Sequence, residues 1–178
     1  LAFDEAGRLF VVENRGYPEG PGEGKPPAGT IALLDASDEG GRYRKRTEFA
    51  GDLTFPNGIA LWRGGIYVTC APDILYLKDT DGDGKADERR IVFTGFSLGG
   101  SSQLRSSHPT LAIDNWIYVS GGLSGGKVVA PSQPNAPAVD IDRSDFRFRP
   151  DGGTFEAVDG KGQFGLAFDA FGRRFFCM

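Results

Sequence analysis

The stretch LAFDEAGRLFVV at residues 1–12 returns as LAFDAFGRRFFC at residues 166–177, and this recurrence decides the fold. Two looser copies lie between them, IALWRGGIYVTC from Ile59 and LAIDNWIYVSGG from Leu111. The four copies start 58, 52 and 55 residues apart. Each reads as an apolar strand, a polar or glycine turn, and a second apolar strand, which predicts an antiparallel pair.

The rest of each interval supplies two further strand-like runs. They are TIALLDA (30–36) with RYRKRTEFA (42–50), DILYLKD (73–79) with RRIVFTGF (89–96), and DFRFR (145–149) with TFEAV (154–158). A repeat of four short strands every 50–60 residues indicates a propeller, because one blade with its loops takes roughly 40–50 residues. We therefore predict an all-β fold, a β-propeller of four-stranded blades that has six blades when complete.

The predicted blades divide the chain into consecutive segments. Blade one covers 1–53, blade two 54–104, blade three 105–162, and the start of a fourth blade 163–178. The chain begins and ends inside apolar runs, so we expect a fragment of a longer propeller. The composition agrees with short strands and tight turns, with 27 Gly and 11 Pro among 178 residues. A net charge of −4 argues against nucleic-acid binding, and no apolar run approaches the roughly 18 residues of a membrane helix.

A meander of four strands places its loops at two ends. The loops after the second strand and the connections between blades share one end, and this end collects the long segments 15–29 and 121–144. Function in repeat scaffolds concentrates where long loops gather on a rigid frame. The polar residues expected on this loop-rich face include Asn14, Arg15, Tyr17, Asn57, Asp73, Gln103, Arg105 and His108.

The run DTDGDGKADERR, residues 79–90, joins the last two strands of blade two and has the spacing of a calcium loop. Carboxylates recur at positions 1, 3, 5 and 9, which are Asp79, Asp81, Asp83 and Asp87. Gly84 permits the sharp turn, and the main-chain carbonyl of Lys85 falls at position 7. Arg90 stands where a helical EF-hand has its closing Glu, so a helical EF-hand is not expected. We predict instead a structural Ca²⁺ in a strand hairpin, on the face opposite the long loops. The alternative is a solvated acidic turn.

Three long strings carry a family resemblance: residues 55–96, QLRSSHPTLAIDNWIYVSGG, and DFRFRPDGGTFEAVDGKGQFGLAFDAFGRRF. With ENRGYP near the start, they resemble the N-terminal propeller of the membrane-bound dehydrogenases with a haem-binding C-terminal domain, the PVC-type haem-binding proteins. That family is similar to the soluble quinoprotein glucose dehydrogenases, which are six-bladed propellers holding pyrroloquinoline quinone and calcium. The resemblance implies a periplasmic or extracellular protein and a haem c domain downstream of this chain.

The same resemblance implies a catalytic role for His108, the only histidine. Quinoprotein sugar dehydrogenases place a histidine base just before the corresponding inner strand, and a neutral imidazole suits proton transfer near neutral pH. An acidic residue before it and a Gly-Arg pair after it, both part of the quinoprotein motif, are absent here. Arg15 and Arg105 are candidates to pair with carboxylates of a cofactor or substrate, and Asn57 and Asp73 are further cofactor-binding candidates. For each, the alternative is an ordinary surface or salt-bridged side chain.

Two functions remain open on the sequence. The first is an extracytoplasmic quinoprotein-like dehydrogenase module that acts on a sugar or alcohol and passes electrons to a haem-bearing domain. The second is a non-catalytic, calcium-stabilised propeller that binds carbohydrate or protein. Propellers host both kinds of function, so the fold alone does not choose between them.

Overall fold

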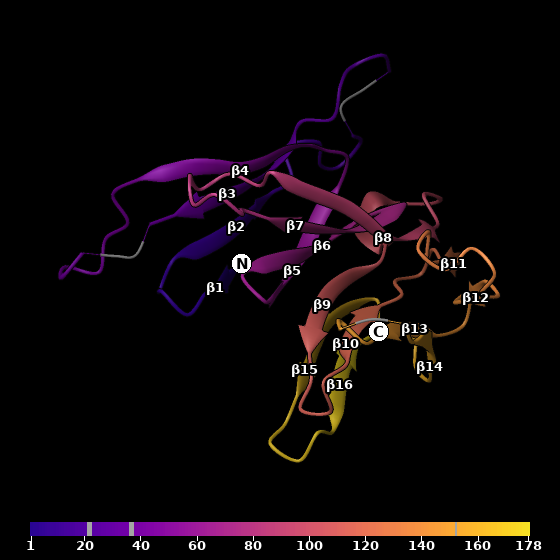
Figure 1. The fold of residues 1–178 in the computed structure, drawn as a ribbon. Coiled ribbons are helices and arrows are strands. Elements are labelled where there is room, and N and C mark those ends of the chain that lie inside the picture. Colours follow the sequence, from indigo (N-terminus) through magenta and orange to yellow (C-terminus); the bar gives the residue numbers. More distant parts are fainter. Residues whose placement is uncertain (21–22, 36–37, 152) are drawn as a thin grey trace.

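The computed structural model describes residues 1–20, 23–35, 38–151 and 153–178 and is built almost entirely from antiparallel strands (Figure 1). Sheet 1 runs in chain order through β1 (Ala2–Phe3), β2 (Leu9–Glu13), β3 (Gly29–Leu34) and β4 (Arg46–Leu53). Sheet 2 contains β5 (Pro56–Trp62), β6 (Gly65–Cys70), β7 (Asp73–Lys78) and β8 (Glu88–Phe96), again as neighbours. The prediction of an all-β fold is therefore confirmed.

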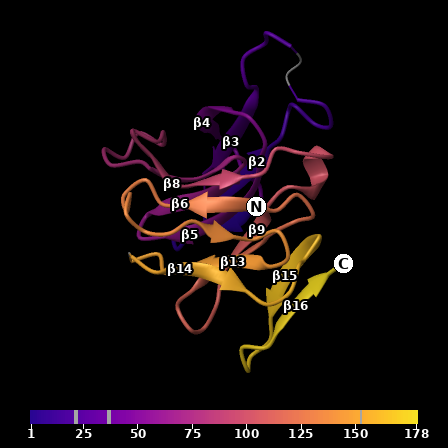
Figure 2. The ribbon, with the colours of Figure 1, turned by 90° about the vertical axis from the view of Figure 1, so that its right-hand side faces the viewer.

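Sheet 3 follows after a short 3-10 helix, η1 (Ser102–Leu104). It consists of β9 (Ser107–Leu111), β10 (Ile117–Ser120), β13 (Asp145–Phe148) and β14 (Phe155–Val158). The chain then forms a hairpin from β15 (Phe164–Phe168) and β16 (Arg174–Cys177). Figures 1 and 2 both place this hairpin against sheet 3. In the described residues, no helix has the length and apolar character needed to cross a membrane.

The segment 121–144, predicted as one long loop, instead contributes two strands to sheet 2. β11 (Gly126–Val129) pairs with β8, and β12 (Val139–Asp140) pairs with β11, so sheet 2 has six strands. Two glycines allow the chains to approach. A Cβ on Gly95, at φ +102°, would lie 2.1 Å from the carbonyl oxygen of Lys127, and one on Gly126 would lie 2.4 Å from that of Gly95. The extra pair covers the edge of β8, which would otherwise expose unpaired amides.

A second difference concerns the last strand of sheet 1. It begins at Arg46 and not at Arg42, because Asp38 draws the preceding residues into a turn. The Asp38 carboxylate accepts hydrogen bonds from the Arg42 amide and from the Arg44 side chain. The strand then continues to Leu53, beyond the predicted end at residue 50.

Sheet 2 is buried on both faces, and the alternation of its side chains explains why. In β6, Ile66 and Val68 pack with Phe10 and Phe49 of sheet 1, whereas Tyr67 points the other way and packs with Phe148 of sheet 3. Successive residues of a strand point to opposite faces, so a strand that is apolar throughout fits between two layers. The three sheets therefore pack face to face in chain order.

The first strands of consecutive sheets lie next to one another. β5 contacts β9, and β9 contacts β15 (Figure 1). Gly58 leaves room for β9: a Cβ there would lie 2.5 Å from Cδ of Pro109 and 3.0 Å from the amide nitrogen of His108. This contact brings the start of β9 against the start of β5 and fixes the position of His108.

Candidate functional site

A cavity of about 200 Å³ opens where β5, β9 and β15 begin. Its lining comes from three sheets, the hairpin and the connection between sheets 2 and 3: Asn14, Tyr17, Asn57, Ser102, Gln103, Ser107, His108 and Phe164. None of these eight side chains is a carboxylate, an ammonium or a guanidinium. The cavity is thus a polar and aromatic site without fixed charge.

The loop after β2 is fastened across the cavity by two hydrogen bonds to η1. The Tyr17 hydroxyl donates to Oε1 of Gln103 at 3.1 Å, and the Ser102 hydroxyl donates to the carbonyl oxygen of Pro18 at 2.6 Å. Tyr17 and Phe164 remain substantially exposed. Their rings therefore supply the aromatic surface that a ligand in the cavity would meet.

His108 has an unusual backbone for a residue in a strand. Its φ is +54°, in the left-handed region that costs a residue with a Cβ about 1 kcal/mol or more. Its Nδ1 lies 2.7 Å from the Ser107 hydroxyl, and among the described residues Nε2 has no hydrogen-bond partner. Desolvation of the ring lowers the pKa of His108 below its ordinary value, so the imidazole is neutral at pH 7.

Asn57 lies at the cavity but both ends of its amide are already engaged. Its Oδ1 accepts a hydrogen bond from the Thr69 hydroxyl at 2.6 Å, and its Nδ2 donates to the carbonyl oxygen of Ser106 at 3.0 Å. Asn57 thereby ties β5 and β6 to the residue that precedes Ser107 and His108. In this structure it positions the histidine segment.

The other three predicted binding residues do not line the cavity. Arg15 pairs with Glu13 at 2.6 Å and is half exposed. Arg105 stacks its guanidinium 4.2 Å from the centre of the Phe55 ring and donates to the carbonyl oxygen of Leu98. Asp73 begins β7, the third strand of its meander, and so lies outward from the first strands that surround the cavity.

The Glu13 carboxylate is a shared hydrogen-bond acceptor at this end of sheet 1. It accepts hydrogen bonds from Arg46, from the Thr30 hydroxyl and from Arg15. The bond from Arg46, followed by that from Thr30, lowers the pKa of Glu13 to about 2. Arg15 is therefore held by an acid of its own sheet.

Six lining residues were not singled out as a site by the sequence: Asn14, Tyr17, Ser102, Gln103, Ser107 and Phe164. Asn14, Tyr17 and Gln103 fall on the expected loop-rich face, but no motif separates them from their neighbours. Phe164 reads as an ordinary strand residue, and only the contact between β9 and β15 brings it to the cavity. To predict this residue, one would have to know how far each strand lies from the cavity, and the repeat pattern does not contain that information.

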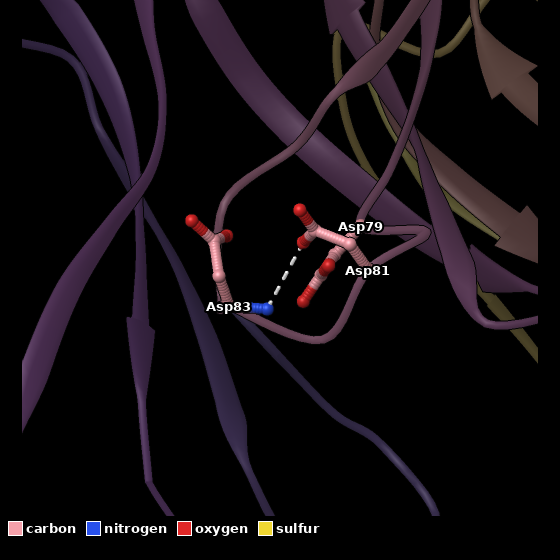
Figure 3. Close-up of side chains that lie close together, drawn as sticks. All are labelled: Asp79, Asp81 and Asp83. Carbon is pink, nitrogen blue, oxygen red and sulfur yellow. Dashed lines mark hydrogen bonds between the residues drawn. The ribbon is translucent and has the colours of Figure 1, made fainter.

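The acidic loop between β7 and β8 gathers three carboxylates. One oxygen each of Asp79, Asp81 and Asp83 lies within 4.8 Å of the others (Figure 3). Burial acts to raise the pKa of Asp79, but the amides of Gly82 and Gly84, which donate to its two oxygens at 2.7 and 2.8 Å, outweigh that effect and lower the pKa.

The two remaining predicted ligands follow in the same loop. The Lys85 amide donates to Asp83 at 2.7 Å. The Asp87 carboxylate accepts hydrogen bonds from the amide and hydroxyl of Thr80, and it is not part of the three-carboxylate group. The hydroxyl of Thr80, followed by its amide, lowers the pKa of Asp87. Thr80 and Asp87 thus close the base of the loop.

The acidic loop and the cavity occupy opposite ends of sheet 2. The strand register pairs Gly65 with Lys78 at one end, beside the acidic loop, and Pro56 with Cys70 at the other. The Ala86 amide donates to the carbonyl oxygen of Phe49 at 2.8 Å, so the loop is also fastened to β4 of sheet 1. A cation in this loop would brace two sheets far from the cavity.

Comparison with known proteins gives one family. A family model with the description "Domain of unknown function (DUF7133)" matches residues 1–178. No curated protein and no solved structure matches the chain.

Proposed function

The chain belongs to the DUF7133 family, a domain of unknown function, and we propose that it is the part of a β-propeller whose inner-strand cavity binds a small polyhydroxylated molecule, a sugar or an alcohol. Sheets 1 to 3 are the proposed blades, and the β15–β16 hairpin is the start of a fourth. Support comes from three meanders of like order packed face to face, with the first strands β5, β9 and β15 in contact. In the proposed propeller, β5, β9 and β15 would be the strands nearest the axis.

One observation carries the ligand class: the cavity combines aromatic rings with neutral hydrogen-bonding groups and has no fixed charge. Tyr17 and Phe164 offer flat apolar surface, on which the C–H face of a sugar packs. His108 Nε2 and the amides of Asn14 and Gln103 offer hydrogen bonds to hydroxyls. Binding sites commonly pair an apolar lining with a few placed polar groups in this way.

The side chains at the cavity do not fit pyrroloquinoline quinone. That cofactor carries carboxylates, which need cationic partners, and the lining has no lysine or arginine. Arg15 is paired with Glu13 and does not line the cavity. Arg105 stacks on Phe55 and donates to Leu98 through Nη2, but its Nε and Nη1 are buried without a partner among the described residues, and it does not line the cavity either. The non-catalytic, carbohydrate-binding propeller is therefore the version that these residues favour.

The dehydrogenase remains a second candidate because of His108. If the Ser107 hydroxyl accepts the Nδ1 hydrogen, the lone pair of the imidazole is on Nε2, where a base must carry it. In this reading the chain is the propeller of a PVC-type, quinoprotein-like enzyme in the periplasm or outside the cell. His108 would accept the proton of a sugar or alcohol hydroxyl, and a redox cofactor would have to accept the hydride before a downstream haem domain could receive the electrons.

We further propose that the acidic loop holds a structural Ca²⁺. The three carboxylates of Asp79, Asp81 and Asp83 fit a hard cation that prefers oxygen ligands. The Lys85 carbonyl and Asp87 stay predicted ligands from the loop spacing. The ion would stiffen the β7–β8 hairpin and its attachment to β4, and it takes no part in events at the cavity.

Sugar titration of the intact protein by calorimetry, with calcium present, tests the proposed function. We expect saturable binding of at least one of D-glucose, D-galactose, myo-inositol and glycerol, and at least tenfold weaker binding by His108→Asn. Asparagine is the matched replacement because it tolerates the left-handed backbone. Binding of none of these compounds would overturn the proposal. Reduction of a redox dye that depends on the sugar and is lost in His108→Asn would favour the dehydrogenase.

A further inference from the structure

An open furrow follows the junction of sheets 2 and 3, at the end of sheet 2 that carries the acidic loop and away from the cavity. It consists of three adjoining hollows of about 350, 80 and 210 Å³. The first two share Tyr67, Arg90 and Pro150 in their linings, and the last two share Gln133 and Gly153. The furrow therefore extends from the β5–β6 turn toward the β11–β12 segment.

The register of sheet 2 places two rows of side chains on the floor of the furrow. In the first row, Tyr67 of β6 pairs with Tyr76 of β7, which pairs with Arg90 of β8. Two residues farther along the strands, Lys78 of β7 pairs with Glu88 of β8. Alternate residues of a strand point to the same face, so both rows face sheet 3. The floor thus crosses the strands, and it offers a ligand side chains and not a free strand edge.

The furrow collects an excess of positive charge on a chain that is acidic as a whole, with a net charge of −4. Its described lining holds four cations and two carboxylates: Arg63, Lys78, Arg90 and Arg149 against Glu88 and Asp151. A groove lined mainly by one sign of charge attracts ligands of the opposite sign. The lining therefore favours an anionic ligand.

Two of the cations have no acid to neutralise them. Arg63 and Lys78 form no ion pair with any described residue, whereas Arg90 has Glu88 at 3.5 Å. Both lie at the β5–β6 turn, where a Cβ on Gly64 would lie 3.7 Å from Cε of Lys78. The acidic loop that follows Lys78 is fastened to β4, on the other side of sheet 2. Its carboxylates are thus drawn away from the furrow.

Aromatic rings hold the two outer guanidinium groups in place. Arg63 lies 5.4 Å from the centre of the Trp62 ring, and Arg90 lies 5.1 Å from that of Tyr76. Burial raises the pKa of Tyr67 to about 12, and the charges of Arg90 and Arg63 act to lower it, because both lie near that ring. A stacked guanidinium keeps its N–H edges for an anion. Arg63 and Arg90 are exposed, so a ligand in the furrow can reach them.

We infer that this furrow binds a linear acidic polysaccharide, whose carboxylates or sulfate esters pair with the cations while its rings lie along the floor. An extended peptide commonly adds to a free strand edge, which the floor does not offer, so the geometry favours the polysaccharide over an acidic peptide. The furrow shares no lining residue with the cavity. The inference is therefore independent of the proposed function.

Calorimetry on the intact protein tests the inference with two matched pairs of probes, oligogalacturonate with its methyl ester and dextran sulfate with dextran. We expect the charged member of at least one pair to bind about tenfold more tightly or better, and that pair identifies the anionic group. This preference should disappear in about 1 M salt, which screens charges more than about 3 Å apart.

Variants of the furrow should change the affinity in both directions. Arg63→Asn combined with Arg90→Gln should weaken the charged probe about tenfold, and Asn tolerates the left-handed backbone at φ +47°. Asp151→Asn removes a carboxylate, so it should strengthen binding about twofold. Arg42→Gln is the matched control, because the Arg42 side chain is 71% exposed and lies outside the furrow. It should leave the affinity unchanged.

Several outcomes would overturn the inference. They are equal affinities within both pairs, and a double variant that binds as well as the original protein. Oligoglutamate that binds as tightly as the charged polysaccharide would indicate an acidic peptide, and binding that requires calcium would place the polysaccharide at the acidic loop. A circular dichroism melt identifies variants that unfold, and the gain expected for Asp151→Asn cannot come from unfolding. Binding of neutral monosaccharides at the cavity is measured separately, so failure here leaves the proposed function standing.

Discussion

His108 combines a strained backbone with an open ring nitrogen, and the two properties can be separated by substitution. Glycine adopts a φ of +54° without the clash that a Cβ makes. We expect His108→Gly to raise the unfolding free energy by about 1 kcal/mol, or the melting temperature by about 2–4 °C. The same variant should bind the sugar at least tenfold more weakly. A lower melting temperature would show that the ring contributes more to packing than the strain removes.

Glu13 gives the cavity end of sheet 1 a defined response to acid. Its folded-state pKa of about 2 lies below the ordinary value of 4.5, so the unfolded chain takes up the proton first. The ionised Glu13 carboxylate therefore stabilises the fold fully above about pH 4.5, and this stabilisation is lost as the pH falls toward 2.

Arg46→Met tests this response, because it removes the largest cause of the lowered pKa. The free energy of unfolding is measured with urea at pH 7 and at pH 3. Between these two pH values, we expect the original protein to lose about 1 kcal/mol more stability than Arg46→Met. Lys45→Met is a suitable control, since the Lys45 ammonium lies 4.0 Å from Asp35 and does not contact Glu13. Parallel pH profiles for the original protein and Arg46→Met would contradict the assignment.

At the scale of single elements, the β7–β8 hairpin depends on its acidic loop. Three carboxylates within 4.8 Å repel one another unless a cation is present. Calcium at about 100 times its dissociation constant should stabilise the fold by about 2.7 kcal/mol and raise the melting temperature by about 5–10 °C. Asp81→Asn should abolish that gain, whereas Asp151→Asn, in another turn, should keep it. Identical melting curves in calcium and in chelator would rule out the site.

The elements that the sequence predicts best are those whose pattern is complete within one repeat. The run IALWRGGIYVTC contains two apolar strands and their turn, and it forms β5 and β6 with the turn at Arg63 and Gly64. β11 escaped prediction because GKVV is only four residues long and pairs with β8, about thirty residues earlier in the chain. Its pairing depends on two glycines at φ above +100°, Gly95 and Gly126. The sequence alone does not indicate that the two strands approach each other at these glycines.

The candidate site was predicted in part for a related reason. His108 and Asn57 lie at the starts of β9 and β5, close to the contact between these strands, and they reach the cavity. Arg15, Arg105 and Asp73 were assigned to the same face of the molecule. Assigning a residue to this face says at which end of the sheet it lies, but not how far it is from the first strands, which surround the cavity. Asp73, for example, lies on the third strand of its sheet.

At the scale of the whole molecule, the close approach of β8 and β11 joins sheet 2 to the segment that follows sheet 3's second strand. Gly95→Ala should be destabilising by about 3 kcal/mol or more, since its Cβ would meet the Lys127 carbonyl in a left-handed backbone. Gly41→Ala is the matched control: φ is +73°, but no atom lies within 4 Å, so only about 1–2 kcal/mol should be lost. Urea denaturation gives both values, and equal losses would contradict the close approach.

The β11–β12 arm has a consequence for how such a chain can be inherited. The unit that recurs in the sequence and the unit that pairs in space are out of phase, because 126–140 lies within the third repeat and completes the sheet of the second. A recombination event that duplicated or deleted residues 54–104 alone would leave one arm without an edge to join, or one edge without an arm. We therefore expect repeats in this lineage to be gained and lost as neighbouring pairs. The breakpoints should fall after the β11–β12 segment and not at the boundary of one repeat.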